Sequence, residues 1–461
     1  MDSNNIAVQI LDYLSKPLEN DENHFLSAKL AILDTIGCIV QASNFEQVHS
    51  FAVAETSVEL SKNPFTTVKN FNSLMDSTWY LTVLTRWFDY NDTFLAKEWG
   101  HPSDNFGSIY TFFQRNNNYK FVDFTTALTK AYEIQGSLCL GTSLNKLGFD
   151  HVFFVKLASG SVFSYLLSDG NSDIVKRTIN NILMDGPSSR AYRHFPNVGK
   201  RKSWAAADAS KRGIELSQIS RTTDEVYDTI QNQEDWGFEN IFMKNSELSF
   251  GKDLDDWVIQ NVLFKVLYPA EFHGQSAVEA ATQLSSEFNQ NRDKVEKINI
   301  YTHEPAVRII SNKKELKNAS DRDHSLEYMV AAALLYGDLK YEMYEDNFSG
   351  LTEINELRKI IHVQEEPKFT ENYYEFSKRH ISNSIEILYN DQTQSEKITI
   401  ENPIGHPSRR EEAVPLLEEK FMKNVESTFS LKKAKKVWNE ILNLKKDDDV
   451  IKLFSILIED E

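Results

Sequence analysis

The spacing of apolar residues constrains the fold of this chain most strongly, and that spacing changes near residue 269. Through roughly the first two hundred residues, apolar side chains recur at helical intervals, as in FLSAKLAILDTIGCIVQA, where Leu26, Leu30 and Leu33 share one face. Farther on, KVEKINIYTHE and SNSIEILYNDQTQSEKITIEN alternate apolar and polar residues, which is typical of strands. After PIGHPSRR, helical spacing returns in VPLLEEKFMKNVESTF.

These changes divide the sequence into three segments and predict a mainly α fold. Residues 1–268 form the first part of a large helical domain, residues 269–404 an inserted α+β domain, and residues 405–461 a helical return. Inside the insertion, we expect Asn390 and Asp391 to form the turn between two strands. HSLEYMVAAALLYG, in the same segment, is expected to be a helix.

Charge and hydropathy exclude several classes of protein. The net charge of −18 argues against a protein that binds nucleic acid through its phosphates, although a local pocket of Lys and Arg can still bind a small anion. The sequence contains no run of eighteen apolar residues, so we expect no membrane span. The N-terminal MDSNNIAVQILDYL resembles neither a secretory signal nor a transit peptide. We therefore expect a cytoplasmic protein, with the mitochondrial matrix as the alternative.

The cysteine count limits the chemistry available to this chain. Cys38 and Cys139 are the only two cysteines, and they are far apart in the sequence. An iron–sulfur cluster of the [4Fe–4S] type takes most or all of its ligands from cysteine thiolates, so two are too few. Any dehydration by this protein must therefore be acid–base chemistry by side chains, in a reducing compartment.

RWFDYNDTFLAKEWGHPSDN, residues 86–105, sets ionisable side chains among large aromatic ones. On a helix, Asp89 and Thr93 would share a face, because they are four residues apart. His101 follows in a Gly-His-Pro turn, where Pro102 disfavours the helical conformation of His101. The functional interpretation is an active site, and the structural alternative is that Asp92 caps locally while His101 simply ends the helix.

Two further stretches carry candidate groups, each with a structural alternative. In GFDHVFFVKLAS, His151 is either catalytic or a buried histidine at a helix start that Asp150 caps. AYRHFPNVGKRKSWAAADA places a set of cations before a helix, where an anion could bind, although a solvated basic loop is slightly favoured by the spacing alone. That set is Arg193, His194, Lys200, Arg201 and Lys202.

The junction with the insertion contains a third set of polar residues. In NVLFKVLYPAEFHGQSAVEAA, Lys265 has apolar neighbours, and Glu271 and His273 follow Pro269. Domain junctions are favoured ligand sites. In DRDHSLEYMVAAALLYG, His324 and Tyr328 would share a helix face, although structural tyrosines are common. No P-loop, dinucleotide-binding, HExxH or GxSxG motif occurs where its fold would require it.

Taken together, these stretches resemble the MmgE/PrpD family, and specifically its 2-methylcitrate dehydratase branch. The resemblance is carried by LDTIGC, RWFDYNDTFLAKEWGHPSDN, AYEIQG, GFDHVFFVKLAS, AYRHFPNVGKRKSWAAADA, NVLFKVLYPAEFHGQSAVEAA, THEPAVRII, DRDHSLEYM and PIGHPSRREEAVPLLEEKF. They occur in the family's order from about residue 33 to residue 421. EWGHPSDN and the PAEFH segment are the most specific of them.

The resemblance implies a helical domain built from both chain ends, an α+β lid, and an active site in the cleft between them. It also implies a homodimer that takes a small tricarboxylate and needs no cofactor, iron–sulfur cluster or metal. By motif match, the catalytic residues are Asp89, His101 and His151. The substrate-binding residues are Thr93, Lys202, Lys265, His273 and Tyr328, and His273 is the weakest transfer.

The implied reaction, that of a hydro-lyase, removes water from 2-methylcitrate to give 2-methyl-cis-aconitate in propionate catabolism, the 2-methylcitrate cycle. The departing proton lies beside a carboxylate, so cations must neutralise the growing charge while His101 and His151 act as acid and base. Asp89 could orient a histidine, act as base or bind the hydroxyl. The alternatives are a cis-aconitate decarboxylase of the same family and a catalytically dead paralogue that is a dimeric binding protein.

The sequence also departs from the family pattern. Phe94 replaces a usual Trp, Lys97 replaces a small residue, and Pro305 follows THE where a small residue is usual. GTSLNK stands where ENSFNR is more usual. These departures bear on substrate preference and activity more than on the type of reaction.

Overall fold

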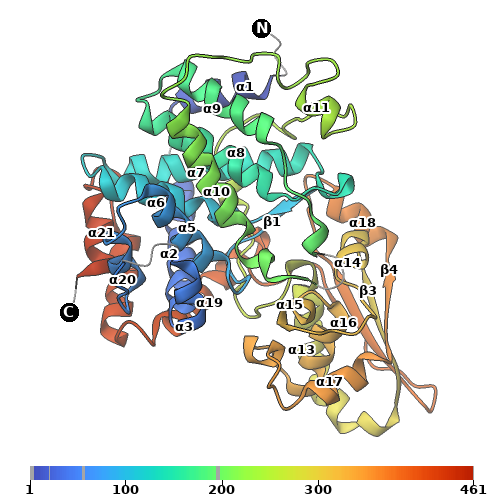
Figure 1. The fold of residues 1–461 in the computed structure, drawn as a ribbon. Helices are drawn as coiled ribbons and strands as arrows, with labels where there is room; N and C mark the ends of the chain where they lie inside the picture. The colour runs from blue at the N-terminus through green and yellow to red at the C-terminus, as the bar shows by residue number, and fades with distance from the viewer. Residues whose placement is uncertain (1–4, 20, 54–57, 194–197, 460–461) are drawn as a thin grey trace.

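The chain forms two lobes that lie side by side (Figure 1). The computed structural model describes residues 5–19, 21–53, 58–193 and 198–459. The larger lobe is helical and combines the N-terminal half of the chain with its last helices. The smaller lobe, which we call the lid, contains helices and a sheet. The expected mainly α fold is therefore confirmed.

Two groups of helices, from opposite ends of the sequence, build the larger lobe. The N-terminal group is α1 (Ile6–Ser15), α2 (Glu22–Ser43), α3 (Glu46–Ala52), α4 (Pro64–Lys69), α5 (Leu74–Arg86), α6 (Phe106–Arg115), α7 (Phe121–Gly141), α8 (Val152–Leu167), α9 (Ser172–Asp185), α10 (Ala205–Ile219), α11 (Phe238–Ile241) and α12 (Trp257–Gln260). The C-terminal group is α19 (Arg410–Val425), α20 (Leu431–Asn443) and α21 (Ile451–Ile458).

Helix α2 is the central helix of this lobe. Asp21 caps it by accepting a hydrogen bond from the backbone N–H of His24 at 2.7 Å. By length and hydropathy alone α2 could cross a membrane, yet 83% of its apolar window is buried inside the protein. Lys420 of α19 donates to Asp34 of α2 at 2.6 Å, and both side chains are buried. This ion pair attaches the C-terminal return to the N-terminal helices.

The lid is a four-stranded sheet with helices packed against it. The strand order is β4-β3-β5-β6, with β3 parallel to β4 and antiparallel to β5, and β5 antiparallel to β6. The strands are β3 (Val295–Thr302), β4 (Ile361–Glu365), β5 (Asn383–Tyr389) and β6 (Ile398–Ile400). The helices are α13 (Gln275–Gln290), α14 (Glu304–Ile309), α15 (Ala319–Arg322), α16 (Leu326–Tyr336), α17 (Leu351–Arg358) and α18 (Pro367–Tyr374).

Each lobe has its own main hydrophobic core. One core takes buried residues from Ile6 to Val266 and again from Ala413 to Leu457, and the other takes residues from Tyr268 to Tyr389. The β5–β6 hairpin around Asn390 and the helix α16 confirm the periodicities expected for the insertion. Whether residues 269–404 fold as an independent domain stays a prediction.

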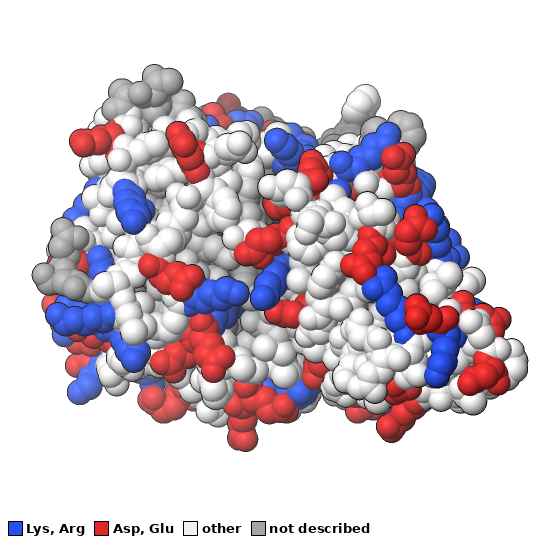
Figure 2. All heavy atoms as spheres, turned by 90° about the horizontal axis from the view of Figure 1, so that it is seen from below, with Lys and Arg blue, Asp and Glu red and all other residues white. Residues whose placement is uncertain are grey.

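The surface carries both signs of charge. On the face seen in Figure 2, acidic and basic side chains are interspersed, and no continuous basic stripe crosses it. The expectation that nucleic acid is not a partner of this protein stays a prediction.

Candidate active site

Asp89 and Thr93 lie in an irregular segment after α5, so the expectation that they share a helical face is wrong. The helix ends at Arg86, and Asp89 has a positive φ of 51°, which no α-helix contains. Thr93 instead pairs with Leu263, its N–H donating at 2.9 Å and its carbonyl accepting at 2.8 Å. That long-range pairing uses the backbone groups that a continuing helix would have needed.

A short hairpin then returns the chain to the same place. The two-residue strands β1 (Phe94–Leu95) and β2 (Trp99–Gly100) pair antiparallel. His101 follows in an extended conformation, with φ −126° and ψ 94°, as expected for a residue before Pro102. The imidazole of His101 therefore lies beside Asp89 and Thr93, at 3.6 Å from Oδ1 and 3.4 Å from Oγ1.

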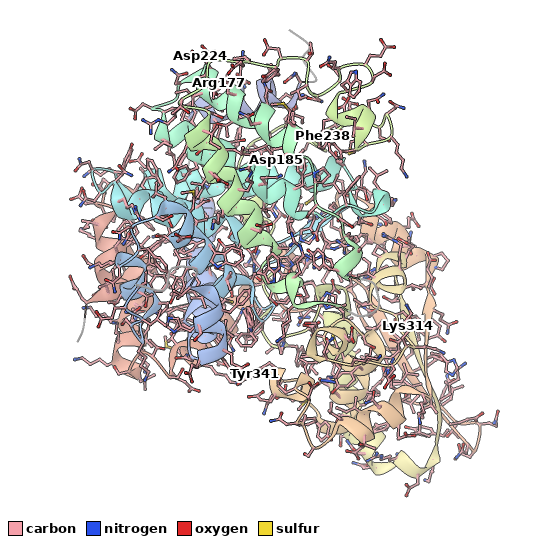
Figure 3. The ribbon with its side chains drawn as sticks, in the orientation of Figure 1. Arg177, Asp185, Asp224, Phe238, Lys314 and Tyr341 are labelled. Carbon is pink, nitrogen blue, oxygen red and sulfur yellow. The ribbon has the colours of Figure 1, made fainter. Side chains whose placement is uncertain are left out.

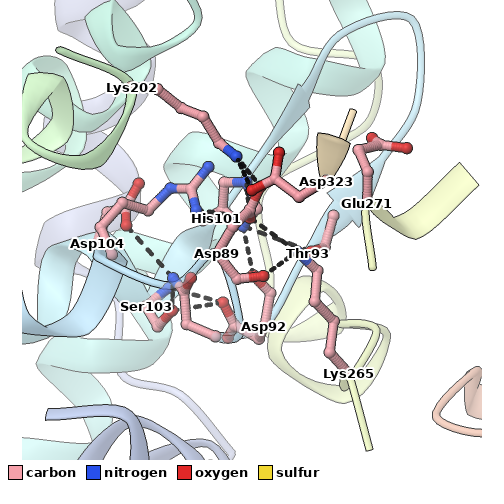
Figure 4. A network of polar contacts seen from close by, with 12 residues as sticks. Asp89, Asp92, Thr93, His101, Ser103, Asp104, Lys202, Lys265, Glu271 and Asp323 are labelled. Carbon is pink, nitrogen blue, oxygen red and sulfur yellow. Dashed lines mark hydrogen bonds and ion pairs between the residues drawn. The ribbon is translucent and has the colours of Figure 1, made fainter. Parts of the chain in front are cut away.

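Asp89 is the centre of a buried cluster of cations (Figure 4). Its carboxylate accepts from Arg86 at 2.6 Å and Lys265 at 2.7 Å, and Lys202 lies 3.2 Å away. Lys265 also donates to the backbone carbonyl of Asp89. Burial alone would raise the pKa of Asp89, but the three cations together hold it well below its usual value. Asp89 is therefore ionised, and it fixes three positive groups around one point.

His101 is neutral, and its free nitrogen faces the cluster. Its Nδ1 lies 2.7 Å from the carbonyl oxygen of Asp92, which can only accept, so Nδ1 carries the proton. Burial, reinforced by the charge of Arg86, lowers the pKa of His101 well below its usual value, although Asp89 opposes the shift. The Nε2 lone pair is consequently available as a base.

His151 also lies beside a carboxylate, but neither of its ring nitrogens has a hydrogen-bond partner among the described residues. Its Nδ1 lies 3.2 Å from Asp150, which accepts from Arg193 at 3.0 Å and from the hydroxyl of Tyr192. Burial lowers the pKa of His151 well below its usual value, against the effect of Asp150. Asp150 is also an acceptor for the N–H of Val152 at 3.3 Å, so the helix-start role expected for it holds as well.

The two imidazole rings lie near each other. Their centroids are 6.1 Å apart, and the Nδ1 of His101 is directed at the carbonyl oxygen of Asp92. Both ring nitrogens of His151 lack a hydrogen-bond partner among the described residues. Two neutral imidazoles with free nitrogens beside a cation cluster can exchange protons with one bound ligand.

Lys202 connects the two lobes. It lies in the 3₁₀ helix Lys200–Ser203, before α10, and donates to Asp323 of the lid at 2.7 Å (Figure 4). His324, beside it, lies 3.2 Å from the same ammonium. Arg201 pairs outward with Asp208, and the predicted His194 lies outside the described residues.

A metal site fits this cluster poorly. Among the described residues, Asp89, Asp323 and His324 are the only group with oxygen and nitrogen atoms close enough to share an ion. The Lys202 ammonium already lies 3.2 Å from one of the carboxylates and 2.7 Å from the other, where a divalent cation would meet its charge. The donor set therefore suits a resident lysine better than a metal.

An inner cavity lies at the cluster, between the two lobes. Its volume is about 20 Å³, enough for about one water molecule, so a larger ligand does not fit the present arrangement of its side chains. The residues that line it are Arg86, Asp89, Thr93, Trp99, His101, His151, Arg190, Arg193, Lys265, Glu271, Phe272, Ile309 and His324. The structure thus brings together residues from segments that are far apart in the sequence.

Three of the predicted substrate-binding residues do not line this cavity. Lys202 lies just behind it, against Asp89 and His324. The imidazole of His273 lies between Glu271, at 2.8 Å, and the hydroxyl of Tyr373, at 3.1 Å, and its ring packs edge-on against Trp99. Tyr328 is buried in the lid core, and its hydroxyl donates to the carbonyl of Met343 at 2.5 Å.

The expected pairing of His324 and Tyr328 on one helix face is wrong. Helix α16 begins only at Leu326, with Ser325 as its cap, so His324 precedes the helix. His324 turns towards the cavity, and Tyr328 turns into the lid. The roles of the other proposed site residues stay predictions.

Sequence reasoning gave no site role to three polar residues that line the cavity. Arg86 opens the RWFDYNDTF stretch, and Glu271 lies in PAEFH. Their place inside motifs that already carried candidate residues is the signal that could have found them. Arg190 stands just before the basic stretch AYRHFPNVGKRK, outside every quoted motif.

The residues that depart from the family pattern lie away from the cavity. Phe94 packs edge-on against Trp257, with centroids 6.0 Å apart, and beneath Arg379. Lys97 is exposed and reaches the carbonyl of Gly141. Pro305 lies in the first turn of α14, where a missing N–H has no consequence. None of these side chains lines the cavity.

Two further buried carboxyls, Asp92 and Asp104, lie next to the site. Burial raises the pKa of Asp92 to about 6 and that of Asp104 to about 7. Asp104 Oδ2 has no hydrogen-bond partner among the described residues. A carboxyl whose pKa is higher in the folded than in the unfolded protein contributes stability at pH values below its unfolded-state pKa. That contribution is lost as the pH rises through the folded-state pKa.

Compared with the wild type, Asp104→Asn is therefore expected to be more stable at pH 8 than at pH 5. The difference in unfolding free energy between Asp104→Asn and the wild type should change in favour of the variant by up to about 1.4 kcal/mol for each pH unit between 5 and 7. Urea unfolding of both proteins at pH 5 and pH 8 measures this difference. A constant difference at the two pH values would contradict the raised pKa of Asp104.

Comparison with known proteins gives consistent matches along the chain. The MmgE/PrpD N-terminal domain matches residues 10–251, and the MmgE/PrpD C-terminal domain matches residues 268–446. The chain is 35% identical to the 2-methylcitrate dehydratase of Escherichia coli K12, over 93% of this chain and 92% of that protein. It is 35% identical to the 2-methylcitrate dehydratase of Cupriavidus necator, over 95% and 93%. It is 37% identical to a probable 2-methylcitrate dehydratase of Saccharomyces cerevisiae, over 87% and 82%.

Proposed function

The chain belongs to the MmgE/PrpD family, and from this premise we propose that it is a 2-methylcitrate dehydratase. As a hydro-lyase, it removes water from 2-methylcitrate and releases 2-methyl-cis-aconitate, as a step of propionate catabolism. The observation that carries this proposal is the arrangement of two neutral histidines around the cation cluster on Asp89.

The chemistry of the elimination fits that arrangement. The hydroxyl leaves from a tertiary carbon, and the proton leaves from the neighbouring carbon, which also bears a carboxylate. Removing that proton places further negative charge next to an anion, so the step needs cations close to the substrate. Arg86, Lys202 and Lys265 supply them from a site with little water.

His101 and His151 divide the proton transfers. One imidazole takes the proton from carbon through a free ring nitrogen, and the proton gained in this way is delivered by the pair to the leaving hydroxyl, which departs as water. Asp89 holds the cations in place, because its oxygens are already occupied and its pKa lies well below its usual value. Thr93, at 3.4 Å from His101, helps to position the substrate.

Four further properties belong to the same proposal. The reaction needs no cofactor, since the two buried cysteines are too few for an iron–sulfur cluster. The protein is a homodimer, supported by the exposed aromatic side chain of Phe51, which lies against the half-buried rings of Trp79 and Trp87. It acts in the cytoplasm, or in the mitochondrial matrix, and its small-molecule partner is a tricarboxylate.

Three substrates distinguish this function from its alternatives. Purified protein is mixed with 2-methylcitrate, citrate or cis-aconitate, and the ultraviolet absorbance of a conjugated alkene is followed. We expect an alkene from 2-methylcitrate at the highest rate. Loss of absorbance from cis-aconitate with release of carbon dioxide would identify a decarboxylase instead. A folded dimer that is silent on all three would be a binding protein.

A further inference from the structure

Arg190 is a buried arginine whose guanidinium has no hydrogen-bond partner in the part of the chain that the structure describes. Its side chain is 5% exposed, and Nη1 has no partner among the described residues. The backbone of Arg190 is fixed by an N–H that donates to the carbonyl of Gly148 at 2.9 Å. The guanidinium lies over the ring of Trp99, 5.2 Å from its centroid. Buried charges are normally paired, so an open guanidinium at this depth needs an explanation.

The other cations of the inner cavity all have carboxylate partners. Arg86 and Lys265 bind Asp89, and Arg193 binds Asp150. Among the described arginines and lysines that line this cavity, Arg190 alone forms no ion pair. Its guanidinium, with Nη1 unpartnered among the described residues, is therefore the one still available to a ligand.

The acidic groups near Arg190 have other partners. Glu98 is buried and accepts from the backbone N–H of Asn145 at 2.7 Å and from its side chain at 2.9 Å. Asp150 accepts from Arg193 and Tyr192. Both carboxylates support the positive charge of Arg190 at a distance. Neither carboxylate is hydrogen-bonded to the guanidinium of Arg190.

Arg190 lies where the inner cavity meets an outer one. The outer cavity has a volume of about 190 Å³ and is rich in cations. The residues that line it are Arg190, Arg193, Val198, Arg308, Ile309, Ser311, Asn312, Lys314, Asp321 and His324. Lys314, on the lid, is labelled in Figure 3. A ligand whose reacting carbon lies between His101 and His151 would extend its far end towards Arg190.

Arg308 approaches the same indole from the lid but is already engaged. Its guanidinium lies 5.6 Å from the centroid of the Trp99 ring. It pairs with Glu304 at 2.5 Å and donates to Asn145 at 2.7 Å. Arg308 is thus a natural comparison for Arg190, being a second arginine beside Trp99 whose donors are satisfied within the protein.

We propose that Arg190 binds, through two parallel hydrogen bonds, a carboxylate of the substrate that takes no part in the elimination. This subsite rests on the proposed function, because it deepens the account of the same cavity. The guanidinium fork matches a carboxylate and lies in a site that excludes water, where such a pair is strong. Arg190 therefore selects tricarboxylates over dicarboxylates.

Two unreactive ligands that differ by one carboxylate test this subsite. Tricarballylate carries three carboxylates, and methylsuccinate is the same molecule without one of the two terminal carboxylates. Calorimetry on the wild type should give a Kd for tricarballylate about 10²-fold lower than that for methylsuccinate. In Arg190→Gln that preference should disappear, and Arg190→Lys should restore only part of it. The control Arg308→Gln should keep the wild-type ratio.

The thermal stability of the ligand-free variants separates binding from a structural role. Because Arg190 forms no ion pair among the described residues and its burial carries a desolvation cost, Arg190→Gln should melt at or above the wild-type Tm. The inference is overturned if Arg190→Gln keeps the preference for tricarballylate, if the wild type shows none, or if the preference falls together with the Tm. Dehydration of 2-methylcitrate is measured separately, so its absence alone would reject the proposed function and leave the subsite standing.

Discussion

Replacing His101 with Gln should lower kcat on 2-methylcitrate by roughly 10²–10⁴-fold, the usual contribution of one general acid or base. The glutamine amide cannot take up a proton near neutral pH, whereas the Nε2 of His101 has a free lone pair. Because the substituted side chain is buried and similar in length, the substrate Kd should change much less than kcat. Steady-state kinetics together with binding calorimetry measure the two quantities.

His49→Gln is the matched control for this variant. His49 is also a buried histidine of the helical lobe, and it hydrogen-bonds the hydroxyl of Tyr80 at 2.8 Å, away from the cavity. Its replacement should leave kcat near the wild-type value. A kcat within a few-fold of wild type in His101→Gln would remove His101 from the proton transfers.

Replacing Asp89 with Asn should both destabilise the protein and abolish most of its activity. The change leaves Arg86, Lys202 and Lys265 without their shared carboxylate in a buried site. Breaking a buried ion pair by removing one partner costs about 3–5 kcal/mol of unfolding free energy. The three cations would also lose their fixed positions, so the charge that grows during proton removal would be poorly neutralised.

Asp34→Asn separates the two effects. Asp34 forms an equally buried pair with Lys420, between α2 and α19. Urea unfolding should show both variants destabilised, but only Asp89→Asn should lose kcat per folded molecule. Wild-type kcat in folded Asp89→Asn would show that the cluster is merely structural.

Much of the fold could be predicted from sequence because it depends on local periodicity. The stripe through Leu30 became the buried helix α2, and the period-two segments became β3 and the β5–β6 hairpin. The change of character near residue 269 coincides with the passage from one hydrophobic core to the other. In these segments each residue's environment follows from its neighbours along the chain.

The site was predictable in its residues more than in its geometry. Asp89, His101, His151, Lys202 and Lys265 do lie together, although the helix expected to align Asp89 with Thr93 does not exist. Local spacing could not show that Thr93 would pair with Leu263, because that contact joins distant segments.

Two other residues show what a motif leaves open. Tyr328 is in the right motif but turns into the lid core, because its hydroxyl finds the carbonyl of Met343. The open fork of Arg190 is visible only when every possible partner around it is known. Side-chain direction and the lack of a partner are three-dimensional properties that one sequence does not contain.

The central claim is that side chains alone perform the dehydration. The most direct measurement is the rate of alkene formation from 2-methylcitrate by protein that has been treated with a chelator and assayed for residual iron. We expect the rate to equal that of the untreated protein, because histidine and lysine side chains remain in place. Loss of the rate on chelation, with recovery on adding iron, would contradict the account.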